Sequence, residues 1–232
     1  MGMNIFRVLG DVSHYTAIIT IFGKIISSKS CKGISGKSQI LNLLVFITRY
    51  NDIFFNFISW YNTSIKIFFI ISSLTNIYLV FVRYKGTISS EMDNFRIEWL
   101  IGIATIMSLI INHELAMFEV LWTFSGKYFA YPNKKCHVYV SVYLESVAIL
   151  PQLTVTNQGK ASDIDSVILF YLSALTSHKL LYIVNWIYRY HNEGFYDIIS
   201  MAAGIIQAAI YVNFFVMFFI KKFAESKIET SV

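Results

Sequence analysis

Charged side chains are scarce in this sequence, and their scarcity argues against an ordinary soluble domain. Only 14% of the residues are Asp, Glu, Lys or Arg, whereas roughly a quarter are charged in a typical globular protein. Hydrophobic residues make up 56% of the chain and aromatic residues 17%. The composition therefore predicts a chain that lies mostly within a membrane.

Cysteine is nearly absent as well, since only Cys31 and Cys136 occur. Cys31 lies in a lysine-rich segment that we expect to face the reducing cytosol, so no disulfide framework is predicted. The first residues also lack the basic stretch and small-residue cleavage site of a removable signal peptide. We therefore expect the first hydrophobic span to target the protein and to remain in it.

Long hydrophobic runs are what the sequence has instead, and ~20 apolar residues suffice to cross a bilayer as a helix. We expect seven spans, at 6–26, 38–59, 64–84, 97–113, 117–155 (disrupted), 166–187 and 196–220. The predicted fold is thus an all-α membrane protein, with a seven-helix transmembrane domain over residues 1–220 and a tail over residues 221–232.

Lysine is unevenly distributed between these spans. Residues 24–37 contain four lysines and no acidic residue, and the tail contains three more. The positive-inside rule places both segments in the cytosol, and an odd number of spans then places the N-terminus in the lumen. The same rule accounts for the net charge of +5, so no nucleic-acid partner is predicted.

Several ionisable side chains lie inside the spans, where an unpaired charge costs at least a few kcal/mol. The topology places them in the lumenal half: Arg7, Asp11, His14, Arg49, Asp52, Glu119 and Arg189. Taken singly, such residues more often join helices or extend to the interface, but several at one depth favour a polar cavity. Three arginines against Asp52 and Glu119 favour a ligand with several carboxylates and one cationic group, such as a short acidic peptide with a free C-terminus.

Seven segments carry a resemblance to a known family. In chain order they are MNIFRVLGDVSHY, SCKGISGKSQIL, TRYNDIF, FRIEWL, NHELAMFEVLWTFS, YLESVAILPQL and NWIYRYHNEGFYDIIS. Over nearly the whole chain they resemble the KDEL receptors, the ER-lumen protein retention receptors. The tripeptide PQL also resembles the wider PQ-loop family of seven-helix proteins, which includes the SWEET-type sugar transporters.

The resemblance implies a PQ-loop/SWEET-like fold and a receptor for a C-terminal Lys-Asp-Glu-Leu or His-Asp-Glu-Leu tetrapeptide on ER-lumen proteins. Such a receptor captures its cargo in the acidic Golgi, returns with it in coatomer vesicles and releases it at neutral pH. It therefore cycles between the Golgi membrane and the ER membrane. No enzyme, cofactor or metal site is predicted, because no nucleophile–base pair is found and Met117 replaces the second His of the zinc-protease-like stretch NHELAM.

The same resemblance assigns roles to individual residues. It implies that Arg49 binds the terminal carboxylate of the ligand, and that Arg7 and Arg189 bind the two acidic side chains. Six further positions would line the cavity: Asp52, Glu119, Trp122, Tyr182, Asn185 and Trp186. The first three of these would face the ligand's Lys or His.

A pH-dependent receptor needs a group that titrates between about pH 6 and 7, and an unperturbed His does so. His14 resembles the family's pH-sensing His, and Glu145 would be its partner in a locking network. Where relatives usually carry Tyr-Arg, this chain has His178 and Lys179. Lys179 keeps the positive charge of the usual Arg but cannot form two parallel hydrogen bonds to one carboxylate. His178 either adds a second titrating group or only packs against its neighbours.

The tail offers Lys221, Lys222 and Lys227 as coatomer-binding residues by resemblance. The alternative is that basic residues just inside the last span anchor the topology and attract anionic membrane lipid. Two other functions compete with the receptor. One is a small-solute transporter of the PQ-loop/SWEET type, in which a neutral sugar would leave the arginines unpaired. The other is a structural membrane protein whose charges pair only with each other.

Residues 126–141, GKYFAYPNKKCHVYVS, interrupt the fifth span where the family runs straight through. Without them this span would cover about 22 residues and ~33 Å, close to the thickness of a bilayer core. Pro132 and the following lysines break a helix inside the membrane. The codons for the two ends of this segment can contain a splice-donor-like and a splice-acceptor-like sequence, and removal of the segment keeps the reading frame. We therefore interpret residues 126–141 as an insertion or a retained intron.

Overall fold

The computed structural model describes residues 4–54, 57, 59–88, 92–111, 136–194 and 196–230, and these contain helices and no strand. The α-helices are α1 (Ile5–Ser28), α2 (Gly36–Arg49), α3 (Trp60–Tyr78), α4 (Ile97–Ile110), α6 (Cys136–Val147), α7 (Leu150–Asn157), α8 (Ser166–Glu193) and α9 (Ile198–Thr230). Short helical turns are η1 (Asn51–Phe54), η2 (Leu79–Arg83), η3 (Lys85–Thr87) and η5 (Ala161–Asp163). The prediction of an all-α fold is confirmed.

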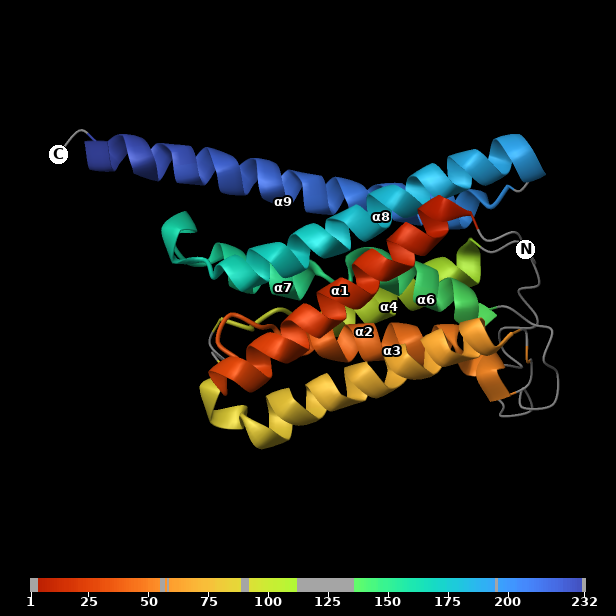
Figure 1. Cartoon of the computed structure of the whole chain (residues 1–232), viewed down its shortest axis with the longest axis horizontal. Coiled ribbons are helices and arrows are strands. Elements are labelled where there is room, and N and C mark those ends of the chain that lie inside the picture. Colours follow the sequence, from red (N-terminus) through yellow and green to blue (C-terminus); the bar gives the residue numbers. More distant parts are fainter. Residues whose placement is uncertain are drawn as a thin grey trace.

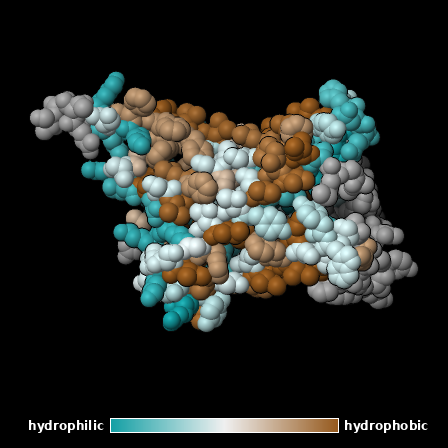
Figure 2. Space-filling view, in the orientation of Figure 1, coloured by the Kyte–Doolittle hydropathy of each residue, from teal (hydrophilic) through white to brown (hydrophobic). Residues whose placement is uncertain are grey.

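The helices lie side by side in one elongated bundle (Figure 1). α1 begins at one end of the bundle, on the right of the view, and α9 ends at the other. Hydrophobic side chains cover much of the middle of this face, while hydrophilic ones gather toward its two ends (Figure 2). This distribution is the one expected of helices whose central parts lie in hydrocarbon.

Among the described residues, four helical stretches are long and apolar enough to cross a membrane. They are Ile5–Ser28, Trp60–Arg83, Ser166–Glu193 and Ile198–Ile228, and the apolar stretch Ile97–Ser108 is shorter. Since several stretches qualify, the chain has the character of a multi-pass membrane protein.

Two predicted spans differ from the helices observed. The run at 38–59 does not form one helix, because α2 ends at Arg49 and the Tyr50 N–H bonds back to Phe46 O, after which η1 begins. Asn and Asp at positions 51 and 52 favour such a turn because their side chains compete for backbone groups. In the disrupted run at 117–155, residues 117–135 lie outside the described residues, and the remainder forms α6 and α7.

The PQL tripeptide begins α7, with Pro151 in its first turn, where a missing N–H costs nothing. Gln152 is fully buried and uses both ends of its amide. Its Oε1 accepts from Ser35 N–H at 2.8 Å, and its Nε2 donates to Gly33 O at 2.8 Å and to Thr156 Oγ1 at 3.1 Å. Gln152 therefore ties α7 to the loop between α1 and α2.

That loop is fixed by further polar contacts at the same end of the bundle. Ser35 caps α2 by accepting from Ser38 N–H, and its hydroxyl donates to Asp93 Oδ1 at 2.8 Å. Lys24 of α1 lies 2.8 Å from Asp165, the N-cap of α8. The hydrogen bond from Lys24 lowers the pKa of Asp165 below its ordinary value, so the pair stays charged at neutral pH.

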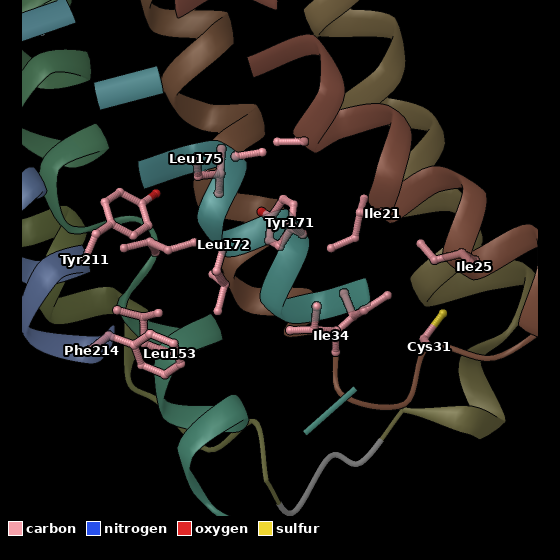
Figure 3. Packing of buried hydrophobic residues seen from close by; sticks show 14 of the residues in the cluster. Ile21, Ile25, Cys31, Ile34, Leu153, Tyr171, Leu172, Leu175, Tyr211 and Phe214 are labelled. Carbon is pink, nitrogen blue, oxygen red and sulfur yellow. The ribbon is translucent and has the colours of Figure 1, made fainter. Parts of the chain in front are cut away.

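Two hydrophobic clusters hold the bundle together. The first joins α1, α7, α8 and α9, with Ile21, Leu153, Leu172 and Phe214 among its members (Figure 3). The second joins α2, α3, α4 and α6, and contains Phe69. Burial of such side chains stabilises by roughly 1.5–3 kcal/mol each in water, while in lipid the close packing itself does so.

Candidate ligand-binding site

A cavity of about 310 Å³ opens between α1, α2, α3, α6, α8 and α9. Among the described residues, four cationic side chains and two carboxylates line it: Arg7, Arg49, Lys66, Lys179, Asp11 and Glu145. The lining therefore carries an excess of positive charge even with both histidines neutral. Such a cavity favours an anionic ligand.

Glu145 of α6 sits at the centre of the charges. Its Oε2 lies 2.6 Å from an Arg49 Nη, and its Oε1 lies 2.5 Å from Lys179 Nζ. The Arg49 Nε also donates to Ser141 Oγ at 3.3 Å. One carboxylate thus joins α2 and α8 through α6, and a buried cluster of this kind is costly to break by removing one member.

Two histidines lie beside this cluster. The ring centroids of His14 on α1 and His178 on α8 are 4.4 Å apart, and the Phe69 ring lies 4.7 Å from His14. His178 Nδ1 lies 2.8 Å from Gly10 O, so its Nδ1–H donates to that carbonyl. Both imidazoles line the cavity, where protonation of either adds to its positive charge.

Gly10 explains how α1 and α8 come this close. A Cβ at this position would lie 2.8 Å from Cδ2 of Tyr182, so only glycine leaves room for the ring. The Tyr182 hydroxyl donates to Asp11 Oδ1 at 2.6 Å, and the Tyr61 hydroxyl lies 3.4 Å from Oδ2. Two tyrosines therefore satisfy the Asp11 carboxylate at the cavity wall.

The family model of the ER lumen protein retaining receptor matches residues 30–189, which is more than half of the chain. The chain belongs to this family. The ER lumen protein-retaining receptor erd-2.1 of Caenorhabditis elegans is 44% identical over 216 residues, covering 93% of each chain. The receptor of Drosophila melanogaster is 44% identical over 228 residues, covering 98% of this chain and 99% of the relative. Receptor 2 of Gallus gallus is 45% identical over 220 residues, covering 94% and 95%.

Membership confirms the resemblance noted in the sequence. The family consists of retention receptors, so the prediction that the protein is not an enzyme is confirmed. The relatives match nearly their whole length, so the family assignment applies to the full helical bundle. Together with its membrane-spanning helices, membership makes the chain a multi-pass membrane protein of the ER–Golgi pathway.

The cavity brings together eight of the residues that the family resemblance assigned to ligand binding or pH sensing: Arg7, His14, Arg49, Glu145, His178, Lys179, Tyr182 and Trp186. Trp186 packs against Gly204 of α9, where a Cβ would overlap the indole ring. The expected partner of His14 was Glu145. Both line the cavity, but both oxygens of Glu145 are engaged by Arg49 and Lys179.

Three other predicted ligand-binding residues, Asp52, Asn185 and Arg189, are not among the described residues that line the cavity. Asp52 Oδ2 lies 2.6 Å from Lys66 Nζ, and Lys66 does line the cavity. Asn185 accepts from the Asn4 side chain at 2.6 Å, and Arg189 Nε lies 2.8 Å from the Glu193 carboxylate one helical turn away. Two further predictions, Glu119 and Trp122, fall outside the described residues.

Five polar residues of the lining were not predicted from the sequence: Tyr50, Asn62, Lys66, Ser200 and Gln207. Lys66 had a usable signal, because it is the one charged residue within the run 60–78. Tyr50 and Gln207 had none, since neither residue type is unusual in a membrane helix of this composition.

The three tail lysines predicted by family resemblance differ in their surroundings. Lys221 donates to the backbone carbonyls of Asn157, at 3.2 Å, and Gly159. Lys222 and Lys227 are exposed on the last turns of α9. One turn beyond Lys221, the Glu225 carboxylate accepts from the N–H groups of residues 161 and 162. The end of α9 is therefore fastened to the loop that follows α7.

We expect Gly10→Ala to destabilise the receptor, because the new methyl group must push the Tyr182 ring away from Asp11. Gly23→Ala on the same helix is the matched control, since a Cβ there meets no atom within 4 Å. Thermal unfolding of both variants in detergent measures the effect. Gly10→Ala should cost about 1–3 kcal/mol, as overpacking does, whereas Gly23→Ala should leave stability unchanged or raised. Equal melting temperatures for the two variants would contradict the close contact.

Proposed function

We propose that this chain is a receptor for C-terminal Lys-Asp-Glu-Leu or His-Asp-Glu-Leu signals, which it binds in the cavity described above. The observation that carries the proposal is the Arg49–Glu145 ion pair inside a positively charged cavity. In this pair the Arg49 guanidinium lies 2.6 Å from the Glu145 carboxylate, which supports binding of a ligand carboxylate at the same place. The names of the relatives, which are ER lumen protein-retaining receptors, support the same function.

Binding on this proposal is an exchange of carboxylates. The terminal carboxylate of the ligand replaces Glu145 on Arg49, and Glu145 keeps its bond to Lys179. Arg7 and Arg189 bind the ligand's two acidic side chains. The exchange conserves the number of charge-assisted bonds to Arg49, so it avoids leaving a buried guanidinium unpaired.

The ligand's cationic first residue is proposed to face Asp52, Glu119 and Trp122. Asp52 is bonded to Lys66 through Oδ2, while its Oδ1 is buried and has no partner within the described part of the chain. That oxygen is available to the ammonium of Lys or the imidazole of His, so we expect signals with either first residue to bind. Tyr182, Asn185 and Trp186 complete the wall.

The proposed topology has seven spans, with the N-terminus in the lumen and the C-terminus in the cytosol. Two observations support it. α1 begins and α9 ends at opposite ends of the bundle (Figure 1), and the lysine-rich segment 24–37 lies at the α9 end, where Lys24 contacts Asp165. The cavity residues of α1 then lie in the lumenal half, which is accessible to lumenal cargo.

Cargo return is proposed to depend on coatomer and on the exposed Lys222 and Lys227 of the tail. Lys221 is the third candidate of this set. The alternative role, attraction of anionic membrane lipid, applies to the same lysines.

We also propose that residues 126–141 are absent from the working protein. Residues 136–141 form the first turns of α6, and Ser141 contacts Arg49. Removal would place Ser125 directly before Val142, so a serine would still precede Val142 and could make the same bond. Sequencing of the transcript tests the proposal: we expect a message without these codons, and a single message encoding all of them would refute it.

Arg49→Ala should abolish binding of a Lys-Asp-Glu-Leu-ending peptide to the purified protein at mildly acid pH. A terminal carboxylate left unpaired in a desolvated pocket costs on the order of 2–5 kcal/mol, and calorimetry or a fluorescent peptide would measure the loss. Arg49→Lys should give an intermediate affinity because it keeps the charge and loses the fork. Arg83→Ala, an exposed arginine outside the cavity lining, is the control. Affinity within a few fold of wild type in Arg49→Ala would remove this residue from the site.

Binding should strengthen as the pH falls from 7.4 to 6, because protonation of a cavity histidine adds positive charge facing an anionic ligand. His14→Ala should flatten this pH profile. His178→Phe keeps an aromatic ring against His14 and loses the titrating nitrogen, so it separates titration from packing at His178. An unchanged profile in His14→Ala would show that His14 is not the sensor. An altered profile in His178→Phe would identify His178 as a second titrating site.

A further inference from the structure

A second, smaller chamber of about 40 Å³ adjoins the ligand cavity. The two share His14, Glu145, His178, Lys179 and Gln207 in their linings. The chamber lies on the far side of the ion pairs from the cavity mouth, further along α1 toward Ser28. Glu145 and Lys179 therefore form a partition with space on both sides.

Two buried amides in this chamber each have one unused hydrogen-bonding atom. Gln39 of α2 and Asn76 of α3 are 4% and 3% exposed, and Asn76 Nδ2 donates to Gln39 Oε1 at 3.5 Å. Within the described ranges, Gln39 Nε2 and Asn76 Oδ1 make no hydrogen bond of good geometry, although the Tyr171 hydroxyl lies next to the Gln39 amide. Buried amide groups of this kind are almost always satisfied in native proteins, by protein or by water. The chamber thus offers one unused donor and one unused acceptor close together.

The chemistry of the lining selects the occupant. A cation is disfavoured by Lys179 and by the engagement of Glu145 in two ion pairs, and an anion is disfavoured by the free acceptor of Asn76. A neutral molecule that both donates and accepts fits both unused groups. One water needs about 10–15 Å³ of such volume, so a chamber of about 40 Å³ holds about three or four waters and no larger solute.

We propose that this chamber binds a cluster of ordered water molecules, anchored at Gln39 and Asn76, that hydrates the Glu145–Lys179 pair from the side opposite the ligand. Its lining includes Ile21, Tyr171 and Tyr211, which are at most 4% exposed and belong to the hydrophobic cluster shown in Figure 3. Water there is held in place by the hydrophobic core rather than exchanged through an open channel.

The water cluster has a role in binding, and this part rests on the proposed function. When a ligand carboxylate takes Arg49, Glu145 Oε2 loses its partner while Oε1 stays with Lys179. Water from the chamber replaces that bond without exposing the site to bulk solvent. The chamber therefore makes the release of Arg49 less costly and increases affinity for the peptide.

The presence of water is tested by X-ray hydroxyl-radical footprinting of the full chain, which oxidises side chains that contact bound water. Tyr171 and Tyr211 should be oxidised despite their burial, and much more than Phe214 and Phe218, which are buried aromatics outside the chamber. In the double variant Gln39→Leu/Asn76→Leu the oxidation of both tyrosines should be lost. Protection of both tyrosines in the wild type would overturn the proposal, and that result does not depend on peptide binding.

The coupling to ligand is tested with the same double variant. The double variant replaces both amides, so neither Gln39 nor Asn76 remains as a buried amide without its partner, and we expect the fold to be retained. Peptide affinity should fall by roughly 10–100-fold, the range for losing a hydrogen bond to a charged group. Asn157→Leu/Gln158→Leu, two exposed positions, is the matched control. Wild-type peptide affinity in a double variant whose two tyrosines are no longer oxidised would refute the coupling between water and ligand. If the wild-type protein fails to bind the peptide while both tyrosines are oxidised, the proposed function alone is refuted.

Discussion

The arrangement of the site depends on the ion pairs of Glu145 with Arg49 and Lys179. These three charges come from α6, α2 and α8, and each is buried enough that losing a partner would leave a charge uncompensated. The carboxylate therefore fixes the three helices in register and keeps the cavity in a shape that is ready for an acid. On the proposed function it also sets the selectivity, because a ligand with its own carboxylate takes Arg49 without leaving the guanidinium unpaired.

The proposed exchange of carboxylates on Arg49 distinguishes the receptor from the two alternative functions, a sugar transporter and a structural membrane protein. A neutral sugar has no carboxylate to offer Arg49, so it would have to bind around an intact ion pair in a cavity with excess positive charge. A purely structural role is also less suited to the cavity. In the described chain its lining has four cationic side chains against two carboxylates, so these charges cannot all pair with each other. Near the lining residue Lys66, Asp52 Oδ1 is buried without a partner in the described chain. An acidic peptide with one cationic end complements both features.

Much of the site could be predicted because the position of a residue within a hydrophobic run and the polarity of its side chain are local properties of the sequence. A charge such as Arg49 inside an apolar run stands out in the sequence, and membrane topology assigns its depth. Pairing could not be predicted in the same way. Glu145 was expected to be the partner of His14 in a locking network, but its ion pairs with Arg49 and Lys179 were not predicted, because those groups meet only after α2, α6 and α8 pack together. The pairing of Lys66 with Asp52 could not be predicted for the same reason, since Asp52 lies in the turn after α2.

The sequence by itself determined that this protein is helical, lies in a membrane and carries ionisable groups inside its hydrophobic runs, because hydropathy, charge placement and family motifs can be read along the chain. Only the tertiary structure decided which groups touch. Gly10 illustrates the difference: in the sequence it is a glycine within a helical run, yet in the bundle it lets Tyr182 reach Asp11 and His178 reach a backbone carbonyl. Contacts between distant helices depend on packing to within a few tenths of an ångström, and no local pattern specifies that distance.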